Sequence, residues 1–112
     1  MPHARGYYIY MLTNYNKTVL YCGVTNNLER RIVEHYLQRG NPRTFCGRYQ
    51  TFYLVYYEST NYVNDAIARE KQIKKWSRRK KVELINSFNA QWKFLNHEVV
   101  GEWPPDFSLR SK

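Results

Sequence analysis

The sequence predicts a small α/β domain of the α+β type, a three-stranded antiparallel sheet flanked by helices in the order β-β-α-β-α-α. Two observations carry this prediction. Three short runs are rich in β-forming residues, and three other segments have helix-capping residues and apolar side chains at helical spacing. A chain of 112 residues suffices for one such domain and is too short for two. We therefore expect one domain over residues 1–112, with a core at about 6–95 and a tail at 96–112.

The chain is expected to open with a β-hairpin. Residues 7–12 (YYIYML) and 19–24 (VLYCGV) are rich in aromatic and branched apolar residues, which favour strands. The polar segment between them, residues 13–18 (TNYNKT), has the length of a hairpin loop. Antiparallel pairing of the two runs follows.

The first helix is expected over residues 28 to 37 or 38. The Thr-Asn-Asn sequence before it supplies N-cap candidates, and Gly-Asn-Pro at 40–42 ends it. Leu28, Ile32 and Tyr36 recur at a spacing of four, as a buried helical stripe requires.

A basic loop and a third strand should follow. Residues 42–50 form the loop, and residues 51–58 (TFYLVYYE) form the most apolar of the three strands, so we expect that strand at the centre of the sheet.

Two helices and a mixed segment complete the expected domain. One helix should start within residues 61–65 and run to Trp76, and Ser77 should cap the next, over 78–88. Residues 91–100 are short and mixed, which fits a small strand or an irregular tail.

The charge balance indicates a polyanionic partner. The net charge is +9 and the isoelectric point is about 9.7. Nucleic acid is the first expectation, ahead of an acidic membrane surface or an acidic protein. There is no signal-peptide pattern and no apolar run of the ~18 residues that span a bilayer.

The cysteines exclude a disulfide scaffold. The chain has two, Cys22 and Cys46, with no Cys-x-x-Cys pair and no Cys/His cluster that would suggest zinc. We therefore expect a cytoplasmic protein with reduced thiols and no membrane partner.

An ordered series of short motifs resembles the GIY-YIG nucleases, most closely their small standalone members, over roughly residues 6–95. It begins with YIY at 8–10 and YCG at 21–23. It continues with GVTNNLERR at 23–31, His35 and AREKQIKKW at 68–76, and ends weakly with NAQW at 89–92. The resemblance implies the GIY-YIG fold and metal-dependent cleavage of nucleic acid.

The chain departs from the family pattern at several positions. Tyr8 stands where the first signature has Gly, with Gly6 two residues earlier, and Cys22 replaces an aliphatic residue in the second. Val24 stands where some relatives have Lys, and Ala90 replaces a Pro. None of these changes removes a proposed catalytic group.

The hairpin tyrosines are the first site candidates. Tyr8 and Tyr10 share a strand face because side chains alternate, and Tyr21 can lie across from Tyr10 if the register permits. Taken alone, these rings would most simply pack in the sheet. The resemblance implies instead that Tyr10 and Tyr21 are the phenols at the reacting phosphate.

Arg31 and His35 lie one helical turn apart and so project from the same face. A guanidinium matches phosphate oxygens, and an imidazole can donate a hydrogen bond or transfer a proton. The alternative is a solvated face, because Arg30 and Glu34 sit beside them. The resemblance places the phosphate-binding arginine at Arg31.

Glu70 is the candidate metal ligand. The plainer interpretation is an ion pair with Lys74, four residues on, which would stabilise the helix by only ~0.2–0.5 kcal/mol. Magnesium commonly takes one or two protein carboxylates and completes its shell with water and substrate phosphate. The resemblance assigns to Glu70 one Mg²⁺ or Mn²⁺ ion that arrives with the substrate.

Further polar residues are candidates for nucleic-acid contacts. Asn89 could bond a phosphate, the metal shell or the backbone, and Asn86 is a competing choice. The cationic candidates are Arg43, Arg48, Lys71, Lys74, Lys75, Arg78 and Arg79. A solvated helix surface is the alternative for some of them.

The resulting expectation is a divalent-metal-dependent endonuclease acting on DNA rather than RNA, in repair or processing. Without a base-reading motif, recognition of shape or of single strands is expected. One alternative is a nucleic-acid-binding module with little activity. Another is an interaction module or homodimer that uses exposed aromatics such as Trp92 and Trp103.

Overall fold

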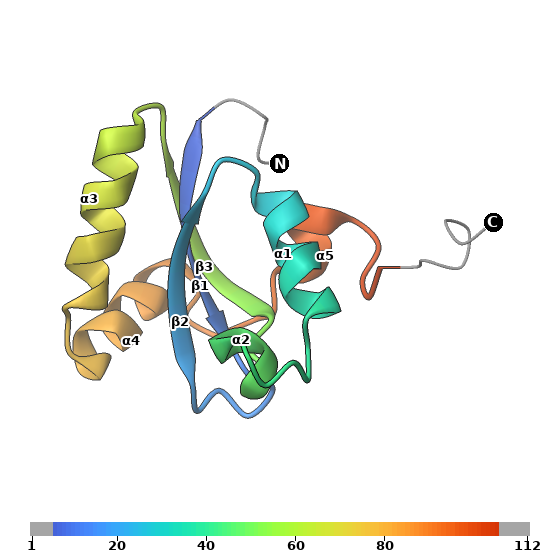
Figure 1. The fold of residues 1–112 in the computed structure, drawn as a ribbon. Helices are drawn as coiled ribbons and strands as arrows, with labels where there is room; N and C mark the ends of the chain where they lie inside the picture. Colours follow the sequence, from blue (N-terminus) through green and yellow to red (C-terminus); the bar gives the residue numbers. More distant parts are fainter. Residues whose placement is uncertain (1–5, 106–112) are drawn as a thin grey trace.

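The computed structural model describes residues 6–105, which form three strands and five helices. Strand β1 (Tyr7–Thr13) pairs antiparallel with β2 (Leu20–Thr25) on one side and with β3 (Tyr53–Thr60) on the other. The predicted hairpin and the predicted fold class, an antiparallel sheet flanked by helices, are confirmed (Figure 1).

The expected position of the third strand is wrong. The sheet order is β2-β1-β3, so β1 is central and β3 is an edge strand. Six of the seven residues of β1 are buried, because it has a strand on each side and helices over both faces. In β3 the burial fades over its second half, so its apolar character reflects only the half that packs in the core.

Side-chain caps start two of the three long helices, α1 (Leu28–Leu37) and α4 (Arg78–Phe88), whereas α3 (Val63–Lys74) has no side-chain cap. Asn27 accepts a hydrogen bond from the Arg30 backbone at the start of α1. α3 starts and ends close to the expected residues. Ser77 caps α4 in the predicted way.

Two short helices were not expected. α2 (Phe45–Arg48) lies within the segment predicted as a basic loop. α5 (Asn96–Val100) lies in the segment predicted as a small strand or irregular tail. Val99 of α5 is fully buried against the sheet, so the core extends beyond residue 95.

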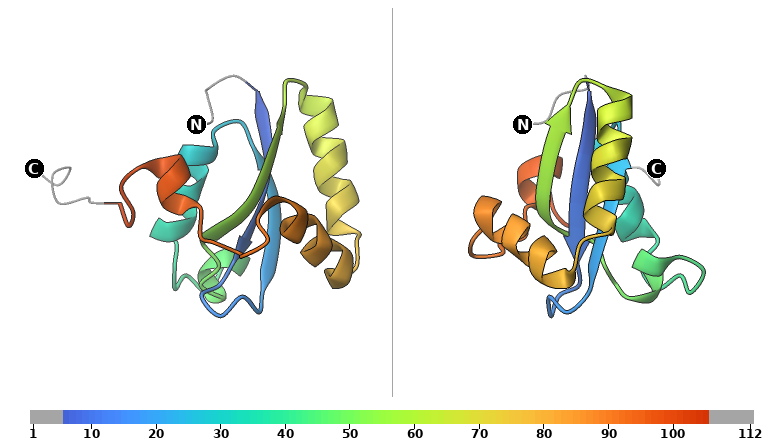
Figure 2. Two further views of the ribbon diagram at one scale, coloured as in Figure 1. Left: turned by 180° about the vertical axis from the view of Figure 1, so that it is seen from behind. Right: turned by 90° about the vertical axis from the view of Figure 1, so that its left-hand side faces the viewer.

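Helices cover both faces of the sheet (Figures 1 and 2). α3 and α4 pack on one face, around Ile9, Met11 and Cys22. α1, α2 and α5 pack on the other, around Tyr8 and Tyr10. Over residues 6–105 no helix combines the length and apolar character needed to cross a bilayer.

Candidate active site

Tyr10 lies at the centre of the candidate site, on the α1 face of β1. Its side chain is only 1% exposed. In the β1–β2 register Tyr10 is opposite Gly23, and a Cβ at Gly23 would lie 2.5 Å from the Tyr10 hydroxyl oxygen and 2.6 Å from its Cζ. The glycine of the second signature therefore leaves the space that the phenol of the first one occupies.

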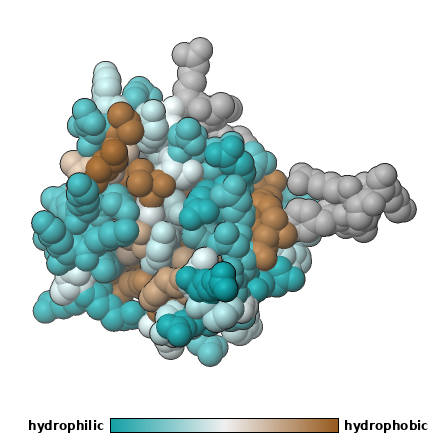
Figure 3. All heavy atoms as spheres, viewed as in Figure 1, coloured by the Kyte–Doolittle hydropathy of each residue, from teal (hydrophilic) through white to brown (hydrophobic). Residues whose placement is uncertain are grey.

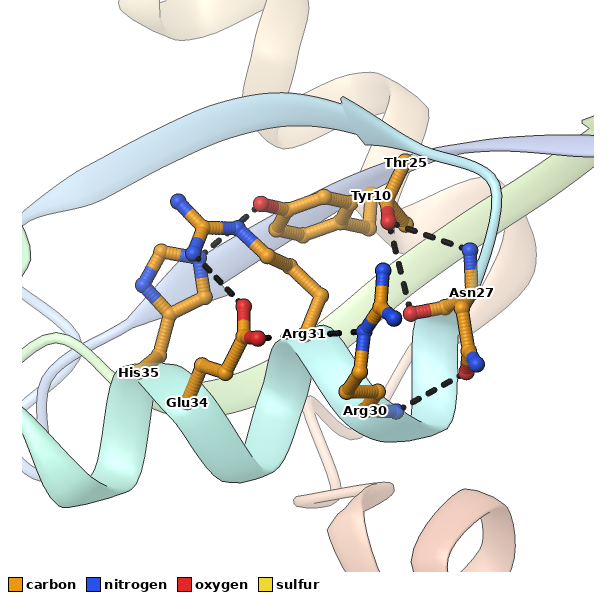
Figure 4. Close-up of polar contacts among 7 residues, drawn as sticks. All are labelled: Tyr10, Thr25, Asn27, Arg30, Arg31, Glu34 and His35. Carbon is orange, nitrogen blue, oxygen red and sulfur yellow. Dashed lines mark hydrogen bonds and ion pairs between the residues drawn. The ribbon is translucent and has the colours of Figure 1, made fainter.

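His35 of α1 holds the Tyr10 hydroxyl. The Tyr10 oxygen is 2.9 Å from His35 Nε2, and both groups are buried (Figure 4). Burial and, secondarily, the nearby Arg31 charge lower the pKa of His35 to about 4. Burial and then the Tyr21 phenol raise the pKa of Tyr10, which Arg31 offsets only in part. The two groups therefore form a neutral pair at pH 7.

Arg31 is the cation that faces this pair. Its side chain is 35% exposed and ion-pairs with Glu34 at 3.0 Å, whereas Arg30 is 65% exposed (Figure 4). Burial by itself would lower the pKa of Arg31, but its hydrogen bond to Glu34 and its interaction with Tyr10 raise it. Of the two neighbouring arginines, Arg31 is thus the one beside the phenol.

Tyr21 lies diagonally from Tyr10, not directly opposite as the sequence suggested. Leu12 is its partner in the register. The Tyr21 ring centroid is still 6.3 Å from that of Tyr10 and 5.5 Å from that of His35. Because β2 is an edge strand of the described sheet and Tyr21 is half-buried, this phenol can be reached from outside.

Glu70 approaches from the other face of the sheet. Its carboxylate, on α3, is 2.7 Å from Lys74 Nζ, and that ammonium lies 5.9 Å from the centroid of the Tyr21 ring. The hydrogen bond to Glu70 raises the pKa of Lys74 against the smaller effect of burial. The ion pair considered from the sequence is therefore present, and its lysine lies beside Tyr21.

Four of the five residues proposed as catalytic cluster at the β1–β2 hairpin, and Glu70 is joined to them through Lys74, which lies beside Tyr21. Arg31 and His35 come from α1, on one face of the sheet, and Glu70 comes from α3, on the other. In Figure 1 β2 runs between these two helical layers. Local sequence cannot show this arrangement, because it depends on how both layers pack on the sheet.

Comparisons with known proteins identify the family of this chain. A profile described as the GIY-YIG catalytic domain matches residues 6–83. The chain belongs to the GIY-YIG family.

Several relatives of this GIY-YIG chain are UPF0213 proteins. One from Pediococcus acidilactici, described as lying in the ldhD 5′ region, is 34% identical over 77% of this chain and 87% of its own length. Another, from Clostridium perfringens, is 38% identical over 82% of this chain and 96% of its own length. The solution structure of the UPF0213 protein BH0048 from Bacillus halodurans gives a TM-score of 0.51 at 27% identity. It covers 82% of this chain and 95% of that protein. These names state no activity.

The divalent ion that a GIY-YIG site implies fits the available donors. Among residues 6–105 no group of three or more His, Cys, Asp and Glu side chains could form a metal cage. Glu70 is a single, 13% exposed carboxylate paired with Lys74, the lysine beside Tyr21. One carboxylate suits Mg²⁺ or Mn²⁺, which keeps waters and takes phosphate oxygens from its substrate.

In this GIY-YIG protein the Asn89 side chain hydrogen-bonds to the backbone of Val55 and Lys93. The buried amide donates to the carbonyl oxygens of Val55 and Lys93 and accepts from the Lys93 backbone N–H. Of the three roles considered, the structure shows the backbone one, which leaves no amide hydrogen for a phosphate. Asn86 accepts a hydrogen bond from Trp92 Nε1.

The cationic candidates fall into two groups. All seven are exposed. Two lie near α2, namely Arg43 and Arg48. The other five lie at the end of α3 and the start of α4, namely Lys71, Lys74, Lys75, Arg78 and Arg79. By contrast, Trp92 and Trp103 are half-buried, and Trp103 packs on the core, so neither is the exposed interface aromatic that was expected.

Two aromatic residues beside the site were not among the sequence candidates. Phe45 of α2 stacks on Tyr21, with 6.1 Å between ring centroids, and Tyr49 follows at 4.9 Å from Phe45. The available signal was the capping residue Thr44, followed by two aromatics at a spacing of four. That pattern predicts a helical turn with both rings on one side.

Proposed function

We propose that this protein is a divalent-metal-dependent endonuclease that hydrolyses phosphodiester bonds of nucleic acid, with DNA preferred and repair or processing as its setting. The observation that carries the proposal is that two phenols, a guanidinium and an imidazole cluster at the β1–β2 hairpin, with the Glu70–Lys74 ion pair beside Tyr21. This set suits phosphoryl chemistry, in which most catalysis is positioning and charge stabilisation.

Each group has a distinct part in the proposed reaction. The half-exposed Tyr21 hydroxyl orients the attacking water, since Tyr10 is buried. Arg31 stabilises charge that develops on the phosphate oxygens. When bound at Glu70, the ion supplies Lewis-acid charge for the phosphate and the leaving oxygen.

Tyr10 and His35 position the site rather than relay protons. Transfer of the Tyr10 proton to His35 would create a phenolate and an imidazolium. The raised pKa of Tyr10 and the lowered pKa of His35 disfavour both ions. The hydrogen bond between them instead fixes the Tyr10 ring, and Arg31 and Tyr21 both interact with that ring.

The test is a cleavage assay with Mg²⁺ or Mn²⁺ on labelled single-stranded, duplex, branched and RNA substrates. Glu70→Ala should abolish cleavage and leave binding nearly unchanged, because Glu70 holds the ion and not the strand. The matched control is Glu83→Ala, which removes another paired glutamate, in this case the partner of Arg79 on α4. Wild-type cutting that persists in the Glu70 variant would refute the metal assignment.

One observation favours the second candidate, a binding module with little activity. Glu70 is already neutralised by Lys74, and the cations around it would grip a strand without cutting it. Salt-sensitive binding by the wild-type protein with no cleavage of any substrate in either metal would support this candidate over the enzyme.

A further inference from the structure

α2 presents two exposed aromatic rings beside the candidate site. Phe45 is 47% exposed and Tyr49 45%, and their ring centroids are 4.9 Å apart. We call this pair the α2 platform. Single exposed apolar residues are ordinary on protein surfaces, so the argument depends on what holds the pair and what it adjoins.

Hydrogen bonds and close packing hold the platform from behind. The Thr44 hydroxyl accepts the Gly47 N–H at 3.0 Å, and the Gly47 carbonyl oxygen accepts from the Gly40 N–H at 2.8 Å. A Cβ at Gly47 would collide with the Gln38 carbonyl oxygen. Cys46 is buried in the core, and its carbonyl oxygen accepts from the Thr51 N–H at 2.8 Å. The helix thus turns its small residues inward and its two large rings outward.

The platform continues the aromatic series of the active site. Ring centroids are 6.3 Å apart from Tyr10 to Tyr21, then 6.1 Å from Tyr21 to Phe45, with the last two rings nearly parallel at 28°. Exposure rises along this series, from the buried Tyr10 to the open faces of α2. A strand whose phosphate lies at Tyr21 and Arg31 would therefore have its next nucleotide over α2.

The charges around the platform suit a nucleic-acid strand. The Arg48 guanidinium lies 6.0 Å from the centroid of the Tyr49 ring, and Arg43 is exposed in the preceding loop. Aromatic rings for the bases combined with cations for the backbone are how proteins bind single strands. A protein partner would need a larger surface than two rings provide, because stable interfaces bury roughly 800 Å² on each partner.

We propose that Phe45 and Tyr49 form a stacking site for an unpaired base next to the scissile phosphate. This inference rests on the proposed function and specifies its substrate class, which is nucleic acid with unpaired nucleotides at the cut, as in a single strand or a single-stranded branch. In a duplex the base faces are already stacked on their neighbours, so a ring can take only a base that has left the stack.

The experiment measures binding without cutting. Glu70→Ala protein in buffer free of divalent metal is titrated against a labelled single strand and the same sequence as a duplex, by fluorescence anisotropy at one salt concentration. Phe45→Leu and Tyr49→Leu should each weaken single-strand binding by about 5-fold or more, the effect of losing one base stack. Duplex binding should change by less than about twofold, an estimate that follows because duplex bases do not reach the rings.

Tyr62→Leu is the matched control. Tyr62 is 68% exposed at the start of α3, the end opposite to α2 in Figure 1, and should leave binding unchanged. Circular dichroism checks the fold of each variant, and Tyr49→Leu is the safer of the two because Phe45 also stacks on Tyr21 of the candidate site. Equal losses for single strand and duplex, or losses no larger than that of Tyr62→Leu, would overturn the proposal.

A modified strand gives an independent readout. A strand with an abasic nucleotide beside the site of contact lacks the stacking base. Protein with Phe45 and Tyr49 intact should bind the abasic strand as weakly as the leucine variants bind the unmodified strand. The leucine variants should bind both strands with equal affinity. Should the variants still discriminate the abasic strand, the base is recognised elsewhere. Because this experiment measures binding and no cleavage, it tests the stacking site even if the nuclease proposal fails.

Discussion

Position 23 must be glycine because the Tyr10 side chain lies against it. The Tyr10 ring fills the space where a side chain at position 23 would lie. Gly23→Ala should therefore push Tyr10 away from His35, abolish most activity and lower the free energy of unfolding by about 1–3 kcal/mol, the usual cost of overpacking. Thermal unfolding and the cleavage assay measure both effects.

The double variant Gly23→Ala with Tyr10→Leu is the control for that prediction. If the collision is with the phenol ring, the stability cost of the alanine should shrink once the ring is truncated. Additive costs would show that Gly23 is required for the backbone of β2 and not for Tyr10.

His35 makes the stability of the protein depend on pH. The pKa of His35 is about 4 in the folded chain and about 6.5 when unfolded, so the unfolded state binds the proton first. The contribution is fully present above about pH 6.5 and is lost as pH falls toward 4, by at most ~3 kcal/mol. Urea unfolding across this range should show the loss, and His35→Gln should flatten it. An unchanged slope in the variant would mean that another group carries it.

At the scale of elements, α3 carries both the carboxylate proposed to bind the metal and the ammonium that would compete with it. Lys74 pairs with Glu70, so a divalent ion must displace an ammonium to reach the carboxylate. Lys74→Met should raise Mn²⁺ affinity several-fold, measured by paramagnetic resonance of free Mn²⁺, and change stability by only ~0.3–0.5 kcal/mol. Lys75→Met, the neighbouring exposed lysine, should change neither. Equal Mn²⁺ affinity in wild type and Lys74→Met would rule out the competition.

The elements that could be predicted are those with local causes. The hairpin runs and the Asn27 and Ser77 caps fix β1, β2, α1 and α4 within a few residues of the chain. The four-residue α2 and the five-residue α5 are too short for a hydrophobic period, and their packing against the core is what stabilises them.

The sequence predicted β3 at the centre of the sheet, and the structure places it at the edge. The reason for this error is related. Strand order depends on pairing between segments far apart in the chain, and an apolar run shows only that a strand is buried somewhere. The register has the same origin. It sets Tyr21 diagonally from Tyr10, through the pairing of Leu12 with Tyr21.

At the scale of the whole molecule, the site exists because two helical layers meet around one edge strand. The identity of its residues came from motif resemblance, whereas the bond from Tyr10 to His35 and the approach of Glu70 from the opposite face came only from the fold. Hydrophilic residues cover most of the face seen in Figure 3, with an apolar group over the start of α3, where Val63 and Ile67 are exposed.

The exposed cations at the end of α3 and the start of α4 should make nucleic-acid binding depend on salt concentration. If the cations at the end of α3 and the start of α4 touch phosphates, the logarithm of the binding constant should fall linearly with that of salt concentration. Each contact contributes ~0.7 to the slope for a single strand and ~0.9 for a duplex. Lys75→Ala and Arg78→Ala should each reduce the slope by about that amount.

Lys93→Ala is the control, because Lys93 is exposed but lies beside β3, at the opposite edge of the sheet. Its removal lowers the net charge by the same amount and should leave the slope unchanged. A slope that falls equally in all three variants would mean that net charge attracts the strand from any side. A difference between the edges would place the strand along β2, beside the clustered phenols and guanidinium and the Glu70–Lys74 ion pair.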